Sequence, residues 1–188
     1  MLDDKKIEES SKVIKQLIQE GIITKPEPEV ASFFLNKSQE TLIVAERLKR
    51  VQEDERIKTN VWVINTSYYS MFFAATALLA KFGHRIKTDV GIHKTTYHAL
   101  VYYFIKENSK IKRQIVEEYV QAVNEAEELL QLGEKKIKSL VEDFDSELSK
   151  RKIFTYEMLD DTQENKAKTS LERAKMFLRE IEKIVNKK

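Results

Sequence analysis

The sequence predicts an all-α fold: an up-down bundle of four to five core helices, preceded by an N-terminal helical arm. Only four Gly and two Pro occur in 188 residues, which leaves little material for turns and favours long helices with few connections. Apolar residues recur at steps of three and four along most of the chain, which is the spacing of one helix face. Residues 61–82 are apolar nearly all the way round, so we expect this segment to be a central helix that the others surround.

Residues 1–28 are predicted to form a helical arm and a linker. Apolar side chains at near-helical spacing over 5–20 indicate a short amphipathic helix, and Gly21 stands where a left-handed C-cap would end it. The following stretch TKPEPE, residues 24–29, holds two prolines and three charges, so it breaks the helical pattern. We assign residues 29–188 to the helical bundle itself.

Three core helices are expected in the first part of this bundle. Residues 30–56 carry apolar or small side chains on one side and charged side chains on the other, as an amphipathic helix does. The central helix follows, with Thr59 or Asn60 as its N-cap and Gly83 at its end. A glycine-bracketed loop then leads to the third helix, at about 92–106.

The longest helical pattern runs over residues 111–148. Roughly 38 residues of helix would be more than about 50 Å long, so one end is expected to project or to bend at Gly133 on the apolar seam. A projecting apolar seam needs a partner, and a second copy of the chain is the simplest one, so we expect a homodimer. Mixed sequence over 150–165 separates this pattern from a last helix at about 166–185.

Charge and composition narrow the classes of function. Lys and Arg (33) nearly balance Asp and Glu (31), so the chain as a whole lacks the electrostatic footprint of a strong nucleic-acid binder, and only a local basic patch is expected. The absence of cysteine excludes disulfides and thiolate metal sites. The N-terminus, MLDDKKIEESSK, is acidic and polar rather than signal-like, and the run from Asn65 to Tyr69 would be costly in lipid. We therefore expect a cytoplasmic protein with no membrane insertion.

Histidines and tyrosines bear on metal and base binding. His93 and His98 stand five residues apart, which turns them to different faces of a helix, and no HExxH spacing exists, so we predict no metal site. Tyr68 and Tyr69 are candidates for stacking on nucleic-acid bases. The alternative for both tyrosines is packing in the core beside Met71.

Two groups of basic residues are candidates for phosphate binding. One is the cluster Lys150, Arg151 and Lys152. The other is Arg85 and Lys87 in the glycine-bracketed loop, which could line the same groove. The alternative is a solvated charged surface. The sequence has no P-loop, dinucleotide-binding fingerprint or Ser-His-Asp constellation, and we expect no cofactor.

The segment YYSMFFAATALL, Tyr68 to Leu79, resembles the HEPN family, specifically its small stand-alone prokaryotic branch, in which a YYAMFHAARALL-like segment marks the second core helix. The opening KQLIQEGII with its proline-containing linker is similar to the N-terminal arm of that branch, and the glycine-bracketed Lys-Thr loop follows the motif. RKIFTY, Arg151 to Tyr156, looks like the RKxADY-type signature between the last two core helices. The resemblance covers residues 12–185 in element order.

The resemblance implies an up-down bundle of four or five helices, usually dimeric, that acts in nucleotide- or RNA-centred defence systems. Some relatives are RNA-cleaving toxins paired with a minimal nucleotidyltransferase antitoxin. Others are non-catalytic binding or scaffold domains. RNA, a nucleotide or a nucleotidyltransferase are therefore the expected partners.

This chain departs from the family pattern at the residues that cleave RNA. Nuclease members carry Arg, four to six residues, then His; here Arg151 is followed after four residues by Tyr156, and no histidine stands at that spacing from an arginine. A tyrosine, with a reference pKa of about 10, is a poor base at neutral pH. Where relatives often carry His and Arg in the central motif, this chain has Phe73 and Thr76.

Three hypotheses follow. The leading one is a homodimeric HEPN-like protein that binds RNA, a nucleotide or a nucleotidyltransferase partner without being an efficient nuclease. The alternative is a metal-independent ribonuclease toxin that uses Arg151 and Tyr156 as a catalytic pair in a dimer cleft. The third is a pure interaction or assembly bundle, which failure to bind RNA or nucleotide at low salt would favour.

Overall fold

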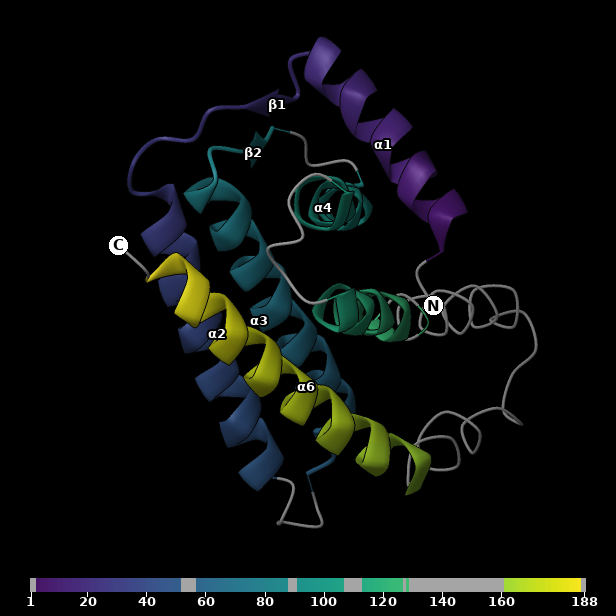
Figure 1. Cartoon of the computed structure of the whole chain (residues 1–188). Helices are drawn as coiled ribbons and strands as arrows, with labels where there is room; N and C mark the ends of the chain where they lie inside the picture. The colour runs from purple at the N-terminus through teal and green to yellow at the C-terminus, as the bar shows by residue number, and fades with distance from the viewer. Residues whose placement is uncertain are drawn as a thin grey trace, which may run out of the picture.

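The structure, a computed structural model, describes residues 3–51, 57–87, 91–106, 113–126, 128 and 161–186. Within these ranges the chain is almost entirely helical, and the predicted all-α helical bundle with an N-terminal helical arm is confirmed (Figure 1). Its elements in chain order are α1 (Asp4–Gln19), β1 (Ile23–Thr24), α2 (Val30–Val51), α3 (Asn60–Lys81), β2 (Arg85–Ile86), α4 (Ile92–Leu100), the π-helical segment η1 (Val101–Lys106), a helix over 113–126, and α6 (Asp161–Val185).

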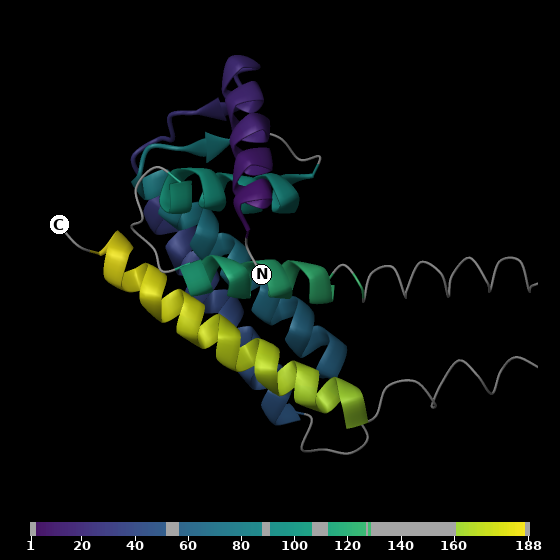
Figure 2. The same cartoon turned by 45° about the vertical axis from the view of Figure 1, so that its right-hand side comes forward.

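Helix α3 is the centre of the bundle, as its apolar sequence predicts. Fourteen of its 22 residues are buried. α2 and α6 lie alongside it, whereas α4, seen nearly end-on in Figure 1, lies across the long helices (Figures 1 and 2). The side chains of Ala74, Ala75 and Ala77 are fully buried, and their small size lets the neighbouring helices approach closely.

Two buried serines fix the register between α2 and α3. The hydroxyl of Ser38 donates to the carbonyl of Ser70 at 2.8 Å, and the hydroxyl of Ser70 donates to the carbonyl of Ser38 at 2.9 Å. Both hydroxyls are therefore satisfied inside an apolar contact, where an unpaired hydroxyl would be costly. The pair holds the two antiparallel helices at one longitudinal position.

α3 is also the described helix whose length and composition would allow it to cross a membrane. Its apolar window has a mean hydropathy of 1.2, and 72% of that window is buried inside the protein. The core helix of a globular protein passes the same test.

One stripe of α3 stays open, contrary to the expectation that protein surrounds the helix on every side. Trp62, Tyr69 and Phe73 follow one another at steps of seven and four; Trp62 is 64% exposed and Tyr69 44% exposed, while Phe73 is partly buried. α2, α4 and α6 pack on the other sides of α3. Phe33 on α2, 54% exposed, and Phe34, whose ring stacks on that of Phe73, extend this apolar surface.

The third predicted helix is present as α4 followed by η1. Four consecutive side chains at the start of η1, from Val101 to Phe104, are buried. A regular α-helix with one apolar face would turn some of them to solvent; the wider π-helical turn accompanies burial on several sides at once. The periodic pattern does not reveal this change of helix type.

The later helices differ from prediction in their boundaries. Of the pattern expected over 111–148, residues 113–126 are helical, and the remainder beyond 128, including Gly133, lies outside the described residues. The last helix, predicted at 166–185, begins at Asp161.

Helix 113–126 packs on α6 through Tyr119 and Phe177, whose ring centroids are 5.9 Å apart. Burial, and after it the neighbouring Tyr68, raises the pKa of Tyr119 well above its ordinary range, so this phenol stays protonated.

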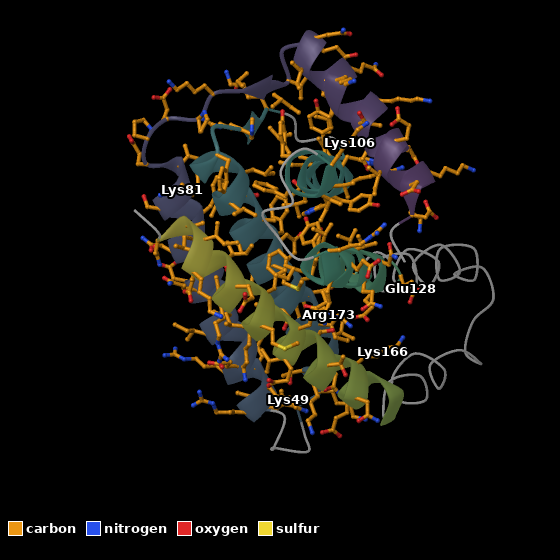
Figure 3. All side chains as sticks on the ribbon, in the orientation of Figure 1. Lys49, Lys81, Lys106, Glu128, Lys166 and Arg173 are labelled. Atoms are coloured by element: carbon orange, nitrogen blue, oxygen red, sulfur yellow. The ribbon has the colours of Figure 1, made fainter. Side chains whose placement is uncertain are left out.

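A partly buried ion pair also joins helix 113–126 to α6. Arg173 donates to the carboxylate of Glu125 at 2.9 Å, and the hydroxyl of Ser170 donates to the same oxygen at 3.0 Å. Figure 3 labels Arg173 on the side of α6 that faces the helix 113–126. The charged groups are only partly exposed to water and have hydrogen-bond partners, which is the condition under which such a pair is tolerated.

The N-terminal arm is docked on the bundle. α1 ends where predicted, with Gly21 at φ 71 directly after the C-cap Glu20. Ser10, fully buried, lies 2.9 Å through its hydroxyl from Nδ1 of buried His98 on α4. Lys106 of η1 donates to Glu8 at 2.9 Å (Figure 3).

The predicted linker contains a short strand that the sequence does not signal. β1 pairs with β2 in an antiparallel ladder, with Ile23 opposite Ile86 and Thr24 opposite Arg85. Figure 2 shows the two strands side by side next to α1. The arm is thus tied to the loop that follows α3.

We expect Arg173→Ala to lower the free energy of unfolding by about 2–3 kcal/mol, because it leaves the Glu125 carboxylate partly buried without its cation. Urea denaturation followed by circular dichroism measures this. As the matched control, Lys183→Ala removes the cation of the exposed Lys183–Glu180 pair and should cost about 1 kcal/mol or less. Equal losses in the two variants would contradict the structural role of the Glu125–Arg173 pair.

We also expect the docked arm to make stability depend on pH. Burial lowers the pKa of His98 below its ordinary 6.5, while Glu9 opposes and Lys94 adds to this shift. Because the unfolded chain binds the proton more readily, stability should fall as the pH drops below about 6.5, until the folded pKa is reached.

His98→Gln, which keeps a hydrogen-bonding side chain beside Ser10, tests this pH dependence. Thermal unfolding between about pH 8 and pH 5 should show a smaller loss of stability for the variant than for the wild type. Parallel pH profiles of the two proteins would show that His98 has no part in the effect.

Candidate functional site

A cleft of about 430 Å³ opens where α2, α3 and α4 meet the loop that contains β2. Its volume lies within the range of small-molecule sites, about 300–1,000 Å³. It is lined by Phe34, Phe72, Thr76, Leu79, His84, Arg85, Ile86, Lys87, Ile92 and Thr96.

The loop at the mouth of the cleft is held on both sides. α3 ends at Lys81, and Gly83, two residues later, has a φ of 86, in the left-handed region that a side chain disfavours. The next N–H, of His84, donates to the carbonyl of Leu79 at 2.9 Å. β2 then pairs with β1, and the N–H of Lys87 donates to the carbonyl of Ile22 at 2.8 Å. Backbone hydrogen bonds therefore fix the position of Arg85 between them.

Arg85 and Lys87 place two positive charges at this mouth. Both side chains are exposed, and within the part of the chain that the structure describes neither forms an ion pair. Other lysines behave differently: Lys49 binds Glu164, and Lys106 binds Glu8. The two loop cations are thus available to an incoming anion.

The start of α4 adds to the positive potential. Its N-cap is Gly91, which has no side chain to accept a hydrogen bond from the first backbone N–H groups. Ile92, the first residue of the helix, lines the cleft. Free N–H groups and the helix dipole favour an anion at such a terminus.

The walls of the cleft are largely apolar, but they include two threonines. Thr96 is 1% exposed, and its Oγ1 has no hydrogen-bond partner among the described residues. An orphaned buried hydroxyl costs about 1–3 kcal/mol. Thr76, which also lines the cleft, is satisfied because its hydroxyl donates to the carbonyl of Phe72 at 3.0 Å. Thr96 is therefore the threonine of the cleft wall whose hydroxyl has no partner among the described residues.

The histidines serve as packing groups. The ring of His84 stacks on Tyr103 with centroids 3.6 Å apart and an interplanar angle of 11°. His93 packs against Phe72, with centroids 4.5 Å apart, and His98 meets the arm. Among the described residues, no group of three or more His, Asp or Glu side chains lies close enough together to hold a metal ion.

The structure brings some of the predicted site residues together. Arg85 and Lys87 line one cleft, as the common loop suggests. Tyr69 lies on the open stripe of α3, whereas Tyr68 is 6% exposed and belongs to the main core, so only Tyr69 presents much of its ring to solvent. The other candidates, Lys150, Arg151, Lys152 and Tyr156, lie outside the described residues, and their place beside the cleft stays a prediction.

Sequence reasoning did not single out Thr96 or the walls of the cleft. A threonine on the inner side of a helix has the same pattern as one that fills a gap in the core, so nothing in the spacing marks Thr96. The paired glycines around the loop were the available signal, because they delimit the segment that closes the cleft.

No protein-family model matches this chain, and no curated protein matches its sequence. The resemblance to the HEPN family therefore stays a prediction that rests on the segments quoted above. The function has to be argued from the geometry of the cleft.

Proposed function

We propose that this chain is a homodimeric, HEPN-like helical protein that binds the phosphate of RNA or of a nucleotide at the cleft, and that it acts in the cytoplasm within a toxin-antitoxin or defence system. The observation that carries the binding proposal is the pair Arg85 and Lys87, which have no carboxylate partner among the described residues and flank an apolar cleft. A nucleotidyltransferase is the proposed protein partner.

Phosphate fits this mouth because several different donors converge on it. Arginine offers a planar fork of N–H groups, lysine a compact charge, and the start of α4 backbone N–H groups that receive no side-chain cap from Gly91. The formal net charge of only +2 means that attraction is local, so binding should be moderate and sensitive to salt.

Binding without efficient cleavage is the better proposal for the chemistry. Cleavage of RNA needs a base for the 2′-hydroxyl and a cation for the phosphorane. The spacing of Arg and His that supplies both in the family's nucleases does not occur in this sequence. The ribonuclease alternative rests on Arg151 and Tyr156 alone.

The open stripe of α3 supports a second copy of the chain as its cover. α3 carries no charged residue from Asn60 to Ala80, so two copies can place this stripe against itself without opposing like charges. Beyond Phe33 and Phe34, α2 carries Lys37 and Glu40, which form an exposed ion pair at 2.9 Å within one chain. Across a two-fold axis, Lys37 of each copy can meet Glu40 of the other.

Replacement of both loop cations tests the binding site. Arg85→Ala combined with Lys87→Ala should weaken binding of a short single-stranded RNA at low salt by about tenfold or more, and should make the dependence of log K on log salt less steep by about 1.4. Fluorescence anisotropy over a salt series measures both. Lys168→Ala with Arg179→Ala, on the exposed face of α6, removes the same charge and is the matched control.

Unchanged affinity in the loop variant, or equal losses in the control, would contradict binding at the cleft. The same RNA, incubated with the wild type in a chelator, should stay intact. Metal-independent cleavage that Arg151→Ala abolishes would support the ribonuclease alternative instead.

Charge on the open stripe tests the dimer. Trp62→Glu places a carboxylate on the proposed interface, at its most exposed aromatic side chain, and should shift the protein to monomer in sedimentation equilibrium. Met176→Glu, at another exposed apolar position on α6, should leave the oligomeric state unchanged. A monomeric wild type at micromolar concentration would contradict the proposed interface.

A further inference from the structure

We infer that the cleft receives a single unstacked nucleobase, so that the ligand is one nucleotide, either free or at the end of a single-stranded RNA. This inference rests on the proposed phosphate binding at Arg85 and Lys87 and adds to it what lies behind the phosphate. Three features support it. They are the apolar walls, the unsatisfied hydroxyl of Thr96 in one of these walls, and the spacing along α4 between its first turn, near the loop cations, and Thr96.

The walls of the cleft suit the faces of a flat ring. Phe72 and Leu79 of α3, Ile86 of β2 and Ile92 of α4 present apolar side chains from three elements. Such walls stabilise the faces of a base that water would otherwise contact. A base within a duplex has its faces stacked and its edge paired, so it cannot enter. The volume of about 430 Å³ is near the lower end for small-molecule sites and suits one nucleotide rather than several.

The hydroxyl of Thr96 favours a ligand that carries a hydrogen-bonding group on its buried part. A hydrocarbon in the cleft would leave its buried hydroxyl unsatisfied, as it is in the ligand-free protein. A base edge supplies the partner that the described residues lack. Because a hydroxyl can both donate and accept, Thr96 can bond to a donor or an acceptor, and we expect little preference among bases.

Helix α4 sets the spacing between the two ends of the ligand. Ile92, at its first turn beside the loop cations, and Thr96 are four residues apart and share one face of the helix. At 1.5 Å per residue they are about 6 Å apart along the axis. A ribose spans a similar distance between its phosphate and its base. Phosphate at the start of α4 therefore places the base beside Thr96, one turn further along.

The test compares Thr96→Val with the wild type, using AMP as the ligand in calorimetry at low salt. Valine keeps the shape of threonine and removes the hydroxyl. Affinity for AMP should fall about tenfold, the loss of one buried hydrogen bond. The ligand-free variant should be as stable as the wild type or more stable, because an orphaned hydroxyl has been removed. Lower affinity combined with undiminished stability separates a ligand contact from a structural one.

Thr76→Val is the matched control. Thr76 lines the same cleft, but its hydroxyl already donates to the carbonyl of Phe72, so its loss should leave affinity for AMP within about twofold of the wild type. Thr96→Ser, which restores the hydroxyl, should recover most of the affinity that Thr96→Val loses.

Further ligands distinguish the parts of the inference. AMP should bind more tightly than inorganic phosphate, because phosphate makes no use of the walls. A 5′-phosphorylated single-stranded oligonucleotide should compete with AMP, whereas its duplex should not. The relative affinities of AMP and the single strand then show whether a free nucleotide or an RNA end is the better occupant.

Several results would overturn the base pocket: equal affinities of AMP and inorganic phosphate, no effect of Thr96→Val on AMP binding, or destabilisation of ligand-free Thr96→Val. The proposed function would still stand if RNA binding continued to depend on Arg85 and Lys87. Failure of RNA, AMP and phosphate alike to bind would overturn both.

Discussion

The burial of α3 is the constraint on which the rest of this structure depends. A helix that is apolar over most of its circumference gains on the order of 25 cal/mol for each square ångström of apolar surface removed from water, so its neighbours must cover it. α2 and α6 do so lengthwise, and α4 does so crosswise at the end where α3 stops. The cleft lies near the end of α3, where α2 and the crossing helix α4 meet the loop that contains β2.

Most of the fold could be predicted from helical periodicity, because a helix that buries one face repeats an apolar residue at every turn. Each turn of α2 or α6 that contacts α3 contributes another apolar residue at the same spacing, and the pattern accumulates over many turns. β1 and β2 show why other parts escape prediction. A two-residue ladder is too short to produce a periodic pattern in the sequence. It also forms only because two segments some 60 residues apart, at Ile23 and Ile86, lie side by side in the fold. The π-helical segment η1 is hidden for a related reason, since a fully buried run looks the same in either helix type.

The candidate site likewise has features that could be predicted from the local sequence and features that depend on the fold. Arg85 and Lys87 could be selected from the sequence because charge in a glycine-bracketed loop is a local feature. That neither has a carboxylate partner among the described residues could not be predicted, since many acidic residues stand elsewhere in the chain and only the fold decides which cations they reach. Thr96 is the clearest case, because no described residue is a hydrogen-bond partner for its Oγ1. This depends on the residues packed around Thr96 in the fold and not on its neighbours in sequence. A polar group that the fold leaves unsatisfied inside apolar walls is informative because the interior normally satisfies such groups.

The strand pairing between the arm and the loop joins two parts of the molecule thermodynamically. Arg85 stands opposite Thr24 in the ladder, so a ligand that bound the loop in its paired position would also favour the docked position of α1, and docking of α1 would in turn hold the loop in that position. Thermodynamic linkage makes the two effects equal. The factor by which docking of the arm raises the affinity for the ligand is the factor by which the bound ligand raises the equilibrium constant for docking of the arm. Under the proposed binding, α1 would report from a distance whether the cleft is occupied, through a sheet only two residues long.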